Sequence, residues 1–226
     1  MRVLASAKAW LHLLGLLFNA PALFRHLHQL YWYRSALMAT LPRTSAHLAG
    51  MKALEVGCAT GDFCGVMVTL GASVHGVDRS ASMVELASAH HSEAHFTVAD
   101  AAALPYSDAS FDIVLAASLL NVVADPVAVL REMARVCRRG GALALLVPAA
   151  GFRHWQARQW LARQGMTARD AAAYLLWHWL ARKVSTAQLD GWLQQAGLAG
   201  ARVVSQQLLG GLACVLHVYP STTQDR

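Results

Sequence analysis

The chain has 226 residues, of which 56% are hydrophobic and 14% are charged. This composition excludes an intrinsically disordered chain, and the length fits one α/β domain with an appendage. The net charge of +6 comes from scattered basic residues with no run longer than two, such as Arg138-Arg139. Charge therefore predicts no DNA partner, although contact with an anionic lipid or an acidic substrate is compatible with it.

The cysteines show neither a C-x-x-C pair nor metal-ligand spacing, which favours free thiols in a reducing, cytoplasmic compartment; they are Cys58, Cys64, Cys137 and Cys214. We expect no metal, and we read the histidines at 90, 91 and 95 as surface residues between a helix and a strand. Near the start, the run 13–18 is far shorter than the ~20 apolar residues of a membrane span. A signal peptide is not expected, because no clean small-x-small cleavage site follows the run.

Residues 1–40 are predicted to form two helices that cap the main domain. The first helix has one narrow polar stripe on an otherwise apolar cylinder, and the second has an apolar stripe made by Leu23, Phe24, Leu27, Leu30 and Tyr31. Helices this apolar need to be covered. We interpret them as a lid on the main domain, and a peripheral membrane or lipid-substrate contact through residues 1–35 is the alternative.

Short apolar strands alternate with helices from residue 53 onward. Strands are expected at 53–56, 73–77, 94–98, 111–116 and 142–147. Helices are expected between them, one opened by a capping box at Ser82–Glu85, one by Asp125-Pro126, and one ended by Gly140-Gly141. This alternation predicts a doubly wound parallel sheet.

The last third of the chain departs from this alternation. Residues 151–183 read as an aromatic-rich helical insertion over the acceptor site, and a further helix at 186–196 precedes strands at 201–207 and 213–219. Gly210-Gly211 between those strands indicates a hairpin. The predicted fold is thus one α/β domain over 1–226, with a Rossmann-like, seven-stranded, mostly parallel sheet, an antiparallel C-terminal hairpin strand and an N-terminal helical cap (1–40). Its cofactor-binding core spans 50–148, and the last helix and strands span 186–219.

A glycine-bearing turn follows the first predicted strand, and such a turn at a helix N-terminus suits a nucleotide. A dinucleotide fold would want G-x-G-x-x-G, but counting from Gly57 the next two glycine positions hold Ala59 and Asp62. Asp78 fits an acid that accepts from ribose hydroxyls. Asp100, after the third strand, can accept from an exocyclic amine such as that of adenine. The pattern therefore favours another adenosine-bearing cofactor over a nicotinamide dinucleotide.

Several motifs in order resemble those of class I S-adenosylmethionine-dependent methyltransferases. They are Leu54–Gly61, Val77–Ser80, Asp100–Tyr106, Phe111–Val114 and Leu130–Gly141, and together they cover about residues 50–148. Asn121-Val122 followed by Asp125 looks most like the quinone C-methyltransferases of ubiquinone and menaquinone synthesis. The chain departs from the family at Ala59, where a middle glycine is usual, and at Arg139, where a proline is usual.

The resemblance implies roles for individual residues around S-adenosylmethionine and its product S-adenosylhomocysteine. Glu55 and the turn 57–61 would hold the methionine end, Asp78 the ribose and Asp100 the adenine amine. Ser118 and Leu119 would face the methyl group and the acceptor. The full set implied to bind the cofactor is Glu55, Gly57, Cys58, Ala59, Gly61, Asp78, Arg79, Met83, Asp100, Ala101 and Ser118.

The expected activity is in-line displacement at the sulfonium methyl, in which the protein mainly supplies proximity and alignment. The acceptor is expected to be a small, fairly apolar molecule, because both candidate lids are rich in Leu, Phe and Trp. If a general base is needed, the candidates are His154, Tyr174 and His178. The protein is expected to be a monomer or a homodimer. The alternatives are a quinone or lipid methyltransferase at the membrane surface and a non-catalytic S-adenosylmethionine-binding protein.

Overall fold

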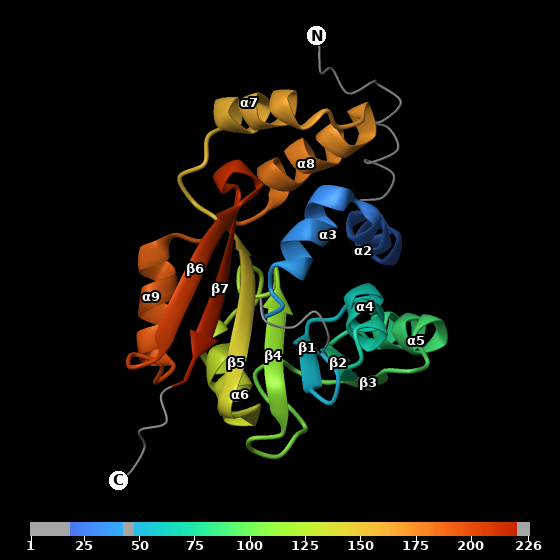
Figure 1. The fold of residues 1–226 in the computed structure, drawn as a ribbon, viewed down its shortest axis with the longest axis vertical. Helices are drawn as coiled ribbons and strands as arrows, with labels where there is room; N and C mark the ends of the chain where they lie inside the picture. Colours follow the sequence, from blue (N-terminus) through green and yellow to red (C-terminus); the bar gives the residue numbers. More distant parts are fainter. Residues whose placement is uncertain (1–18, 43–47, 221–226) are drawn as a thin grey trace.

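The computed structural model describes residues 19–42 and 48–220, so the first predicted helix lies outside the described residues. One seven-stranded sheet has the order β3-β2-β1-β4-β5-β7-β6, in which β7 runs antiparallel to both of its neighbours and the other pairs are parallel (Figure 1). This confirms the predicted fold class. The strands are β1 (Lys52–Val56), β2 (Ser73–Asp78), β3 (His95–Val98), β4 (Phe111–Ala117), β5 (Cys137–Pro148), β6 (Arg202–Leu208) and β7 (Ala213–Tyr219).

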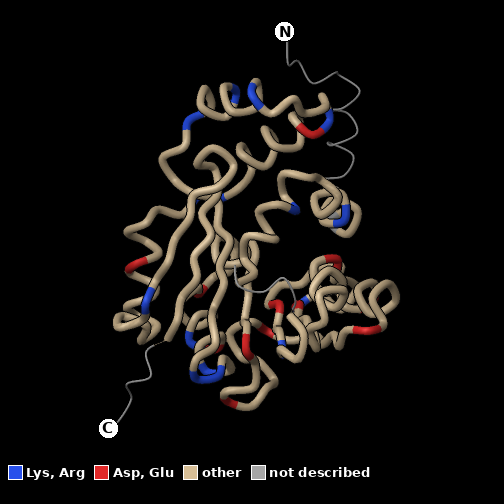
Figure 2. Tube along the Cα trace, in the orientation of Figure 1, with Lys and Arg blue, Asp and Glu red and all other residues tan. Residues whose placement is uncertain are grey.

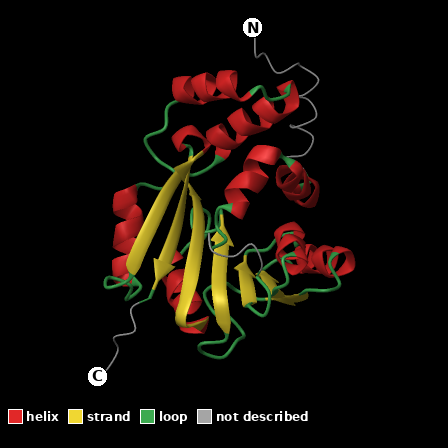
Figure 3. Cartoon of the chain, in the orientation of Figure 1, coloured by secondary structure: helices red, strands yellow, loops and turns green. Residues whose placement is uncertain are grey.

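Helices cover both faces of the sheet, as a doubly wound fold requires (Figure 3). α6 and α9 pack in one buried apolar cluster on one face, while α4 packs in a second cluster that extends upward to α2, α3, α7 and α8. The helices are α2 (Ala20–Gln29), α3 (Tyr31–Met38), α4 (Asp62–Thr69), α5 (Ala81–His90), α6 (Pro126–Val136), α7 (His154–Gln164), α8 (Ala168–Leu180) and α9 (Thr186–Gln195), and the short 3₁₀ turn η1 (Leu209–Gly211) joins β6 to β7.

The described part of the predicted cap is two helices rather than one. The backbone is extended at Leu30, which ends α2 and begins α3. This break changes the helical phase, so Tyr31 is 81% exposed although the single-helix pattern placed it on the apolar stripe. Trp32 and Tyr33 are buried instead.

An aromatic cluster joins the cap to the helical insertion. The ring of Trp32 on α3 lies 5.4 Å from that of Tyr174 and 5.7 Å from that of Trp177, both on α8. Trp160 on α7 stacks on the Tyr174 ring at 4.8 Å between ring centroids. Tyr174 and Trp177 of the insertion are therefore used in packing against the cap, and Figure 1 shows α8 beside α3.

Two local predictions of helix and strand starts were wrong. The cap of α5 is Ser80, whose hydroxyl accepts from the Met83 amide, rather than Ser82. β5 begins at Cys137, so the paired glycines lie inside the strand. A Cβ at Gly141 would lie 2.7 Å from the Asp112 carbonyl oxygen, so glycine there permits the close approach of β5 to β4. The predicted cap at Asp125, before Pro126, is confirmed.

Candidate functional site

The turn after β1 is fastened to the end of β2. The amides of Gly57 and Cys58 both donate to the Val77 carbonyl oxygen, and the Ala59 amide donates to the Asp78 carboxylate at 3.0 Å. Residues 57, 59 and 61 all have positive φ, at 79°, 47° and 76°. Ala59 is thus an alanine in a left-handed conformation that glycine adopts at less cost.

The two glycines of the turn are required by packing. A Cβ at Gly61 would lie 2.7 Å from the Phe96 ring on β3 and 2.9 Å from the Ala87 Cβ on α5. At Gly57 it would lie 2.9 Å from Leu119 Cδ1. Glycine at 61 lets α4 start close against β3 and α5. The expectation that it also admits a ligand stays a prediction. The contact at Gly57 brings the residue after Ser118 onto the turn.

Three acidic residues lie at or near the carboxyl ends of neighbouring parallel strands. Glu55 lies near the end of β1, Asp78 ends β2, and Asp100 comes two residues after β3. The Asp78 oxygens accept from the amides of Ala59 and Ser80, one each, which leaves a lone pair on each oxygen for a ligand hydroxyl. Asp100 is exposed, with one oxygen accepting from the Ala102 amide. This edge of the sheet therefore offers hydrogen-bond acceptors at three separate points.

Glu55 is only 2% exposed. Burial raises the pKa of its carboxyl from 4.5 to about 8, while a hydrogen bond from the Cys64 thiol, 3.0 Å away, acts in the opposite direction. The negative charges of Asp62 and Asp78 raise the pKa further. Without a cation beside it, this carboxyl is mostly neutral at pH 7.

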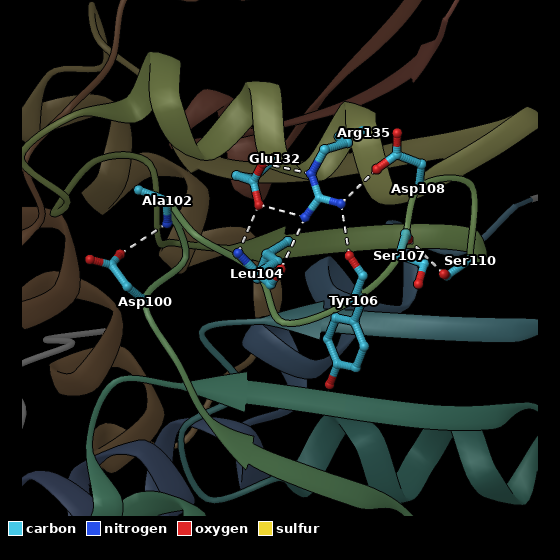
Figure 4. Close-up of polar contacts among 9 residues, drawn as sticks. All are labelled: Asp100, Ala102, Leu104, Tyr106, Ser107, Asp108, Ser110, Glu132 and Arg135. Carbon is cyan, nitrogen blue, oxygen red and sulfur yellow. Dashed lines mark hydrogen bonds and ion pairs between the residues drawn. The ribbon is translucent and has the colours of Figure 1, made fainter.

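The loop that carries Asp100 is clamped to α6 (Figure 4). Arg135 on α6 donates to both Glu132 oxygens at 2.7 Å, and it also reaches the carbonyl oxygens of Leu104 and Tyr106. Glu132 in turn accepts from the Leu104 amide at 2.8 Å. The guanidinium is the largest cause of the lowered pKa of Glu132. The Leu130–Gly141 motif thus holds the loop after β3 in place.

The turn after β4 meets the cap. Ser118 has a φ of 54°, and its hydroxyl accepts a long hydrogen bond of 3.5 Å from Tyr33 on α3. Burial raises the pKa of Tyr33 to about 12, so its hydroxyl keeps its proton and acts as a donor at neutral pH. The sequence reasoning missed Tyr33. Only its place in the aromatic run 31–33 of the predicted cap marked the region.

The three base candidates lie in the insertion. His154 is exposed, accepts from Arg158 at 3.0 Å and stacks on His178 at 6.0 Å. His178 is buried, and burial lowers its pKa. Tyr174 is fully buried, burial raises its pKa, and its hydroxyl donates to the Leu209 carbonyl oxygen. His154 and Tyr174 therefore each already have a hydrogen-bond partner within the protein, and a base role for any of the three stays a prediction.

The other residues predicted to bind the cofactor differ in how exposed they are to a ligand. Cys58 and Met83 are buried, and their amides already donate within the protein, to the Val77 carbonyl oxygen and the Ser80 hydroxyl. Arg79 is exposed and Ala101 is half-buried. Among the residues described, no group of three His, Cys, Asp or Glu side chains is placed to hold a metal ion. No described helix is both long and apolar enough to cross a membrane.

Residues 54–145 match the family model described as a methyltransferase domain. A ubiquinone biosynthesis O-methyltransferase from Chelativorans sp. (strain BNC1) is 33% identical over 104 residues, which cover 44% of this chain and 41% of that protein. The chain thus matches less than half the length of this curated relative. The relative is named for transfer to oxygen, whereas the sequence motifs suggested quinone C-methyltransferases.

Solved structures share the fold. A methyltransferase from Thermotoga maritima, described as a possible histamine N-methyltransferase, has a TM-score of 0.62 at 20% identity and covers 93% of this chain and 99% of its own. The [4+2]-cyclase SpnF has a TM-score of 0.59 at 19% identity, covering 83% and 81%. At these identities the likeness concerns the fold.

Residues 54–145 are a methyltransferase domain of the class I S-adenosylmethionine-dependent type. The cofactor of this class is S-adenosylmethionine, and the acidic residues at the edge of the sheet fit its polar groups. Its ribose hydroxyls and adenine amine can donate hydrogen bonds, and Asp78 and Asp100 have acceptor oxygens at the same edge of the sheet, with the buried carboxyl of Glu55 beside them.

Proposed function

We propose that the protein transfers a methyl group from S-adenosylmethionine to a small, fairly apolar acceptor. The observation that carries the proposal is the row of Glu55, Asp78 and Asp100 along the edge where β1, β2 and β3 end, beside a left-handed turn. The cofactor supplies an activated methyl group, so the protein's task is to bind, orient and exclude water.

Each residue of the edge has a proposed task. Glu55 holds the ammonium of the methionine end, and ionises when that cation lies beside it. Asp78 uses its remaining lone pairs on the ribose, and Asp100 accepts from adenine. Ser118 and the neutral hydroxyl of Tyr33 orient the acceptor, because this hydrogen bond joins the turn after β4 to the cap.

Calorimetric titration with S-adenosylmethionine, S-adenosylhomocysteine and NADH tests the cofactor assignment. We expect micromolar binding of the first two and none of NADH. Asp78→Asn, which keeps an acceptor for one of the two backbone amides, and Asp100→Ala should each weaken binding about tenfold or more. Unchanged affinity in both variants, or binding of NADH alone, would overturn the proposal.

The acceptor variant best supported is a quinone or other lipid-like molecule at a membrane surface. The relatives named for ubiquinone biosynthesis favour it, and so do two exposed tryptophans, Trp155 at 57% and Trp179 at 77%. Basic residues lie along α7, the outermost helix of the same insertion (Figure 2). Aromatic and basic side chains together suit a lipid headgroup region.

Sedimentation with anionic and with zwitterionic vesicles tests this variant. We expect the protein to bind anionic vesicles, and the double variant Trp155→Ser/Trp179→Ser to lose most of that binding while its affinity for S-adenosylhomocysteine is unchanged. Dependence on residues 1–35 alone would assign the contact to the cap. No sedimentation with either vesicle would exclude the membrane variant.

A non-catalytic cofactor-binding protein is the alternative of another class, since this fold is shared by a protein named for a reaction other than methyl transfer and so does not by itself establish that transfer. Transfer of labelled methyl from S-adenosylmethionine to candidate phenols separates the two. Tight cofactor binding without transfer to any of a broad phenol and quinol panel would favour the non-catalytic alternative.

A further inference from the structure

A hollow lies at the carboxyl end of β4, on the face of the sheet that α6 and α9 cover. Its volume is about 260 Å³. That is near the lower end of ligand pockets, which suits a small molecule or one group of a larger one. Its lining comes from the segment after β4, the start of α6, the link between α8 and α9, and the first turns of α9: Leu120, Asn121, Val123, Ala124, Pro126, Arg182, Lys183, Val184, Gln188 and Trp192.

The backbone fixes this hollow beside the candidate site. The Val184 amide donates to the Pro148 carbonyl oxygen at 2.8 Å, and the Ala150 amide donates to the Val184 carbonyl oxygen at 2.9 Å. These bonds hold the link between α8 and α9 at the end of β5. On the other side, Asn121 lies only three residues beyond Ser118, which touches Tyr33.

Asn121 has no partner within the described protein. Its side chain is only 8% exposed, its Oδ1 is fully buried, and no hydrogen bond from a described residue reaches that atom. An unpaired buried amide costs free energy, so its presence in the wall of a hollow indicates that something else pairs with it. Oδ1 is an acceptor, and a flip of the amide puts the two Nδ2 donors in its place, which an anionic group could then accept from.

The charged residues that line the hollow have one sign. Arg182 and Lys183 line it, and neither forms an ion pair with a described residue. The Lys183 ammonium donates to the His178 carbonyl oxygen at 2.6 Å, which leaves donor capacity free. None of the described lining residues is acidic. The nearest acid in sequence is Asp125, and its carboxylate is used to cap α6.

We propose that this hollow binds the carboxylate or phosphate group of a small molecule, with Asn121, Arg182 and Lys183 as its donors. This inference rests on the proposed function in one respect. The molecule is taken to be the methyl acceptor, held by its anionic end while its other end reaches Ser118. Charge-assisted hydrogen bonds from Arg and Lys favour such oxygens over neutral groups. The acceptor would thus be an aromatic or other apolar acid rather than a fully apolar molecule.

Titration of the full chain with two probes, benzoate and inorganic phosphate, tests the proposal. We expect millimolar binding of at least one probe to the wild type, and the probe that binds identifies the group as carboxylate or phosphate. Lys183→Met and Arg182→Gln should each weaken that binding about tenfold. Arg163→Met, on α7 and outside the lining residues, removes the same charge and should leave the probe affinity unchanged.

Asn121→Leu gives an independent readout. It replaces an unpaired amide by a side chain of similar volume, so the thermal midpoint should rise while probe binding falls. Loss of probe binding in all variants including Arg163→Met, or no binding of either probe to the wild type, would overturn the proposal. Affinity for S-adenosylhomocysteine is measured on the same samples. If the wild type does not bind S-adenosylhomocysteine, the proposed function is refuted. Whether the hollow is an anion site is decided separately, by the binding of benzoate or phosphate.

Discussion

The hydrogen bonds around Arg135 predict that its guanidinium stabilises both the fold and the cofactor site. Arg135→Met keeps an aliphatic side chain but loses two bonds to Glu132 and the bonds to the carbonyl oxygens of Leu104 and Tyr106. All of these bonds are charge-assisted, because the guanidinium is charged, and such bonds contribute roughly 1.5–3 kcal/mol each. Glu132 is 19% exposed and regains water in the variant, so we expect a net loss of about 3 kcal/mol in the free energy of unfolding.

Urea unfolding and calorimetry with S-adenosylhomocysteine measure the two effects. Because the loop that carries Asp100 must then be ordered on binding, the Kd should rise at least about fivefold, or ~1 kcal/mol. The matched control is Asp108→Ala, which removes a partner of Arg135 that is 79% exposed and should change stability by under about 0.5 kcal/mol. Equal losses in both variants, or an unchanged Kd in Arg135→Met, would refute the reasoning.

Three further substitutions have defined expectations. Since the pKa of Glu55 is raised to about 8, unfolding releases a proton between pH 4.5 and 8, and stability falls as pH rises through this window. As pH rises through this window, the free energy of unfolding of Glu55→Gln should therefore increase relative to that of the wild type by up to about 1.4 kcal/mol per pH unit. A difference in stability between the two proteins that does not change with pH would contradict the burial argument. Ala59→Gly relieves a left-handed alanine and should stabilise by about 0.5–1 kcal/mol in urea unfolding; a loss would show that the methyl group packs favourably. Asp125→Ala removes the cap of α6, and should cost about 1 kcal/mol in the same assay; no loss would mean that water caps the helix equally well.

Much of the fold could be predicted because its signals are local. Asp125-Pro126 specifies a helix start through one side chain and one fixed φ, and it lies where it was predicted. The break of the cap at Leu30 has no such signal, because neither glycine nor proline is present there and packing of Trp32 and Tyr33 decides it. The early start of β5 likewise depends on the close approach of Gly141 to β4, which is a property of the sheet.

The candidate site also has some residues that local sequence signals predict and others that they do not. Asp78 and Asp100 could be assigned to one edge because parallel strands end together, and the topology bears this out. Tyr33 and the hollow around Asn121 could not be assigned, because each is assembled from segments far apart in the chain. The contact between Tyr33 and Ser118 joins residues 85 apart. No periodicity or spacing encodes such a meeting.

The aromatic cluster couples the cap and the insertion, because it packs side chains of the two segments against each other. Trp32 belongs to the first described helices and Tyr174 to a segment that follows β5, yet their rings meet edge to face while neither segment is a strand of the sheet. Stability losses from changing the two residues should therefore not add, because removing either ring already loosens the other's support. A ligand that ordered one of the two segments should also order the other. We therefore expect the cap and the insertion to move together over the candidate site.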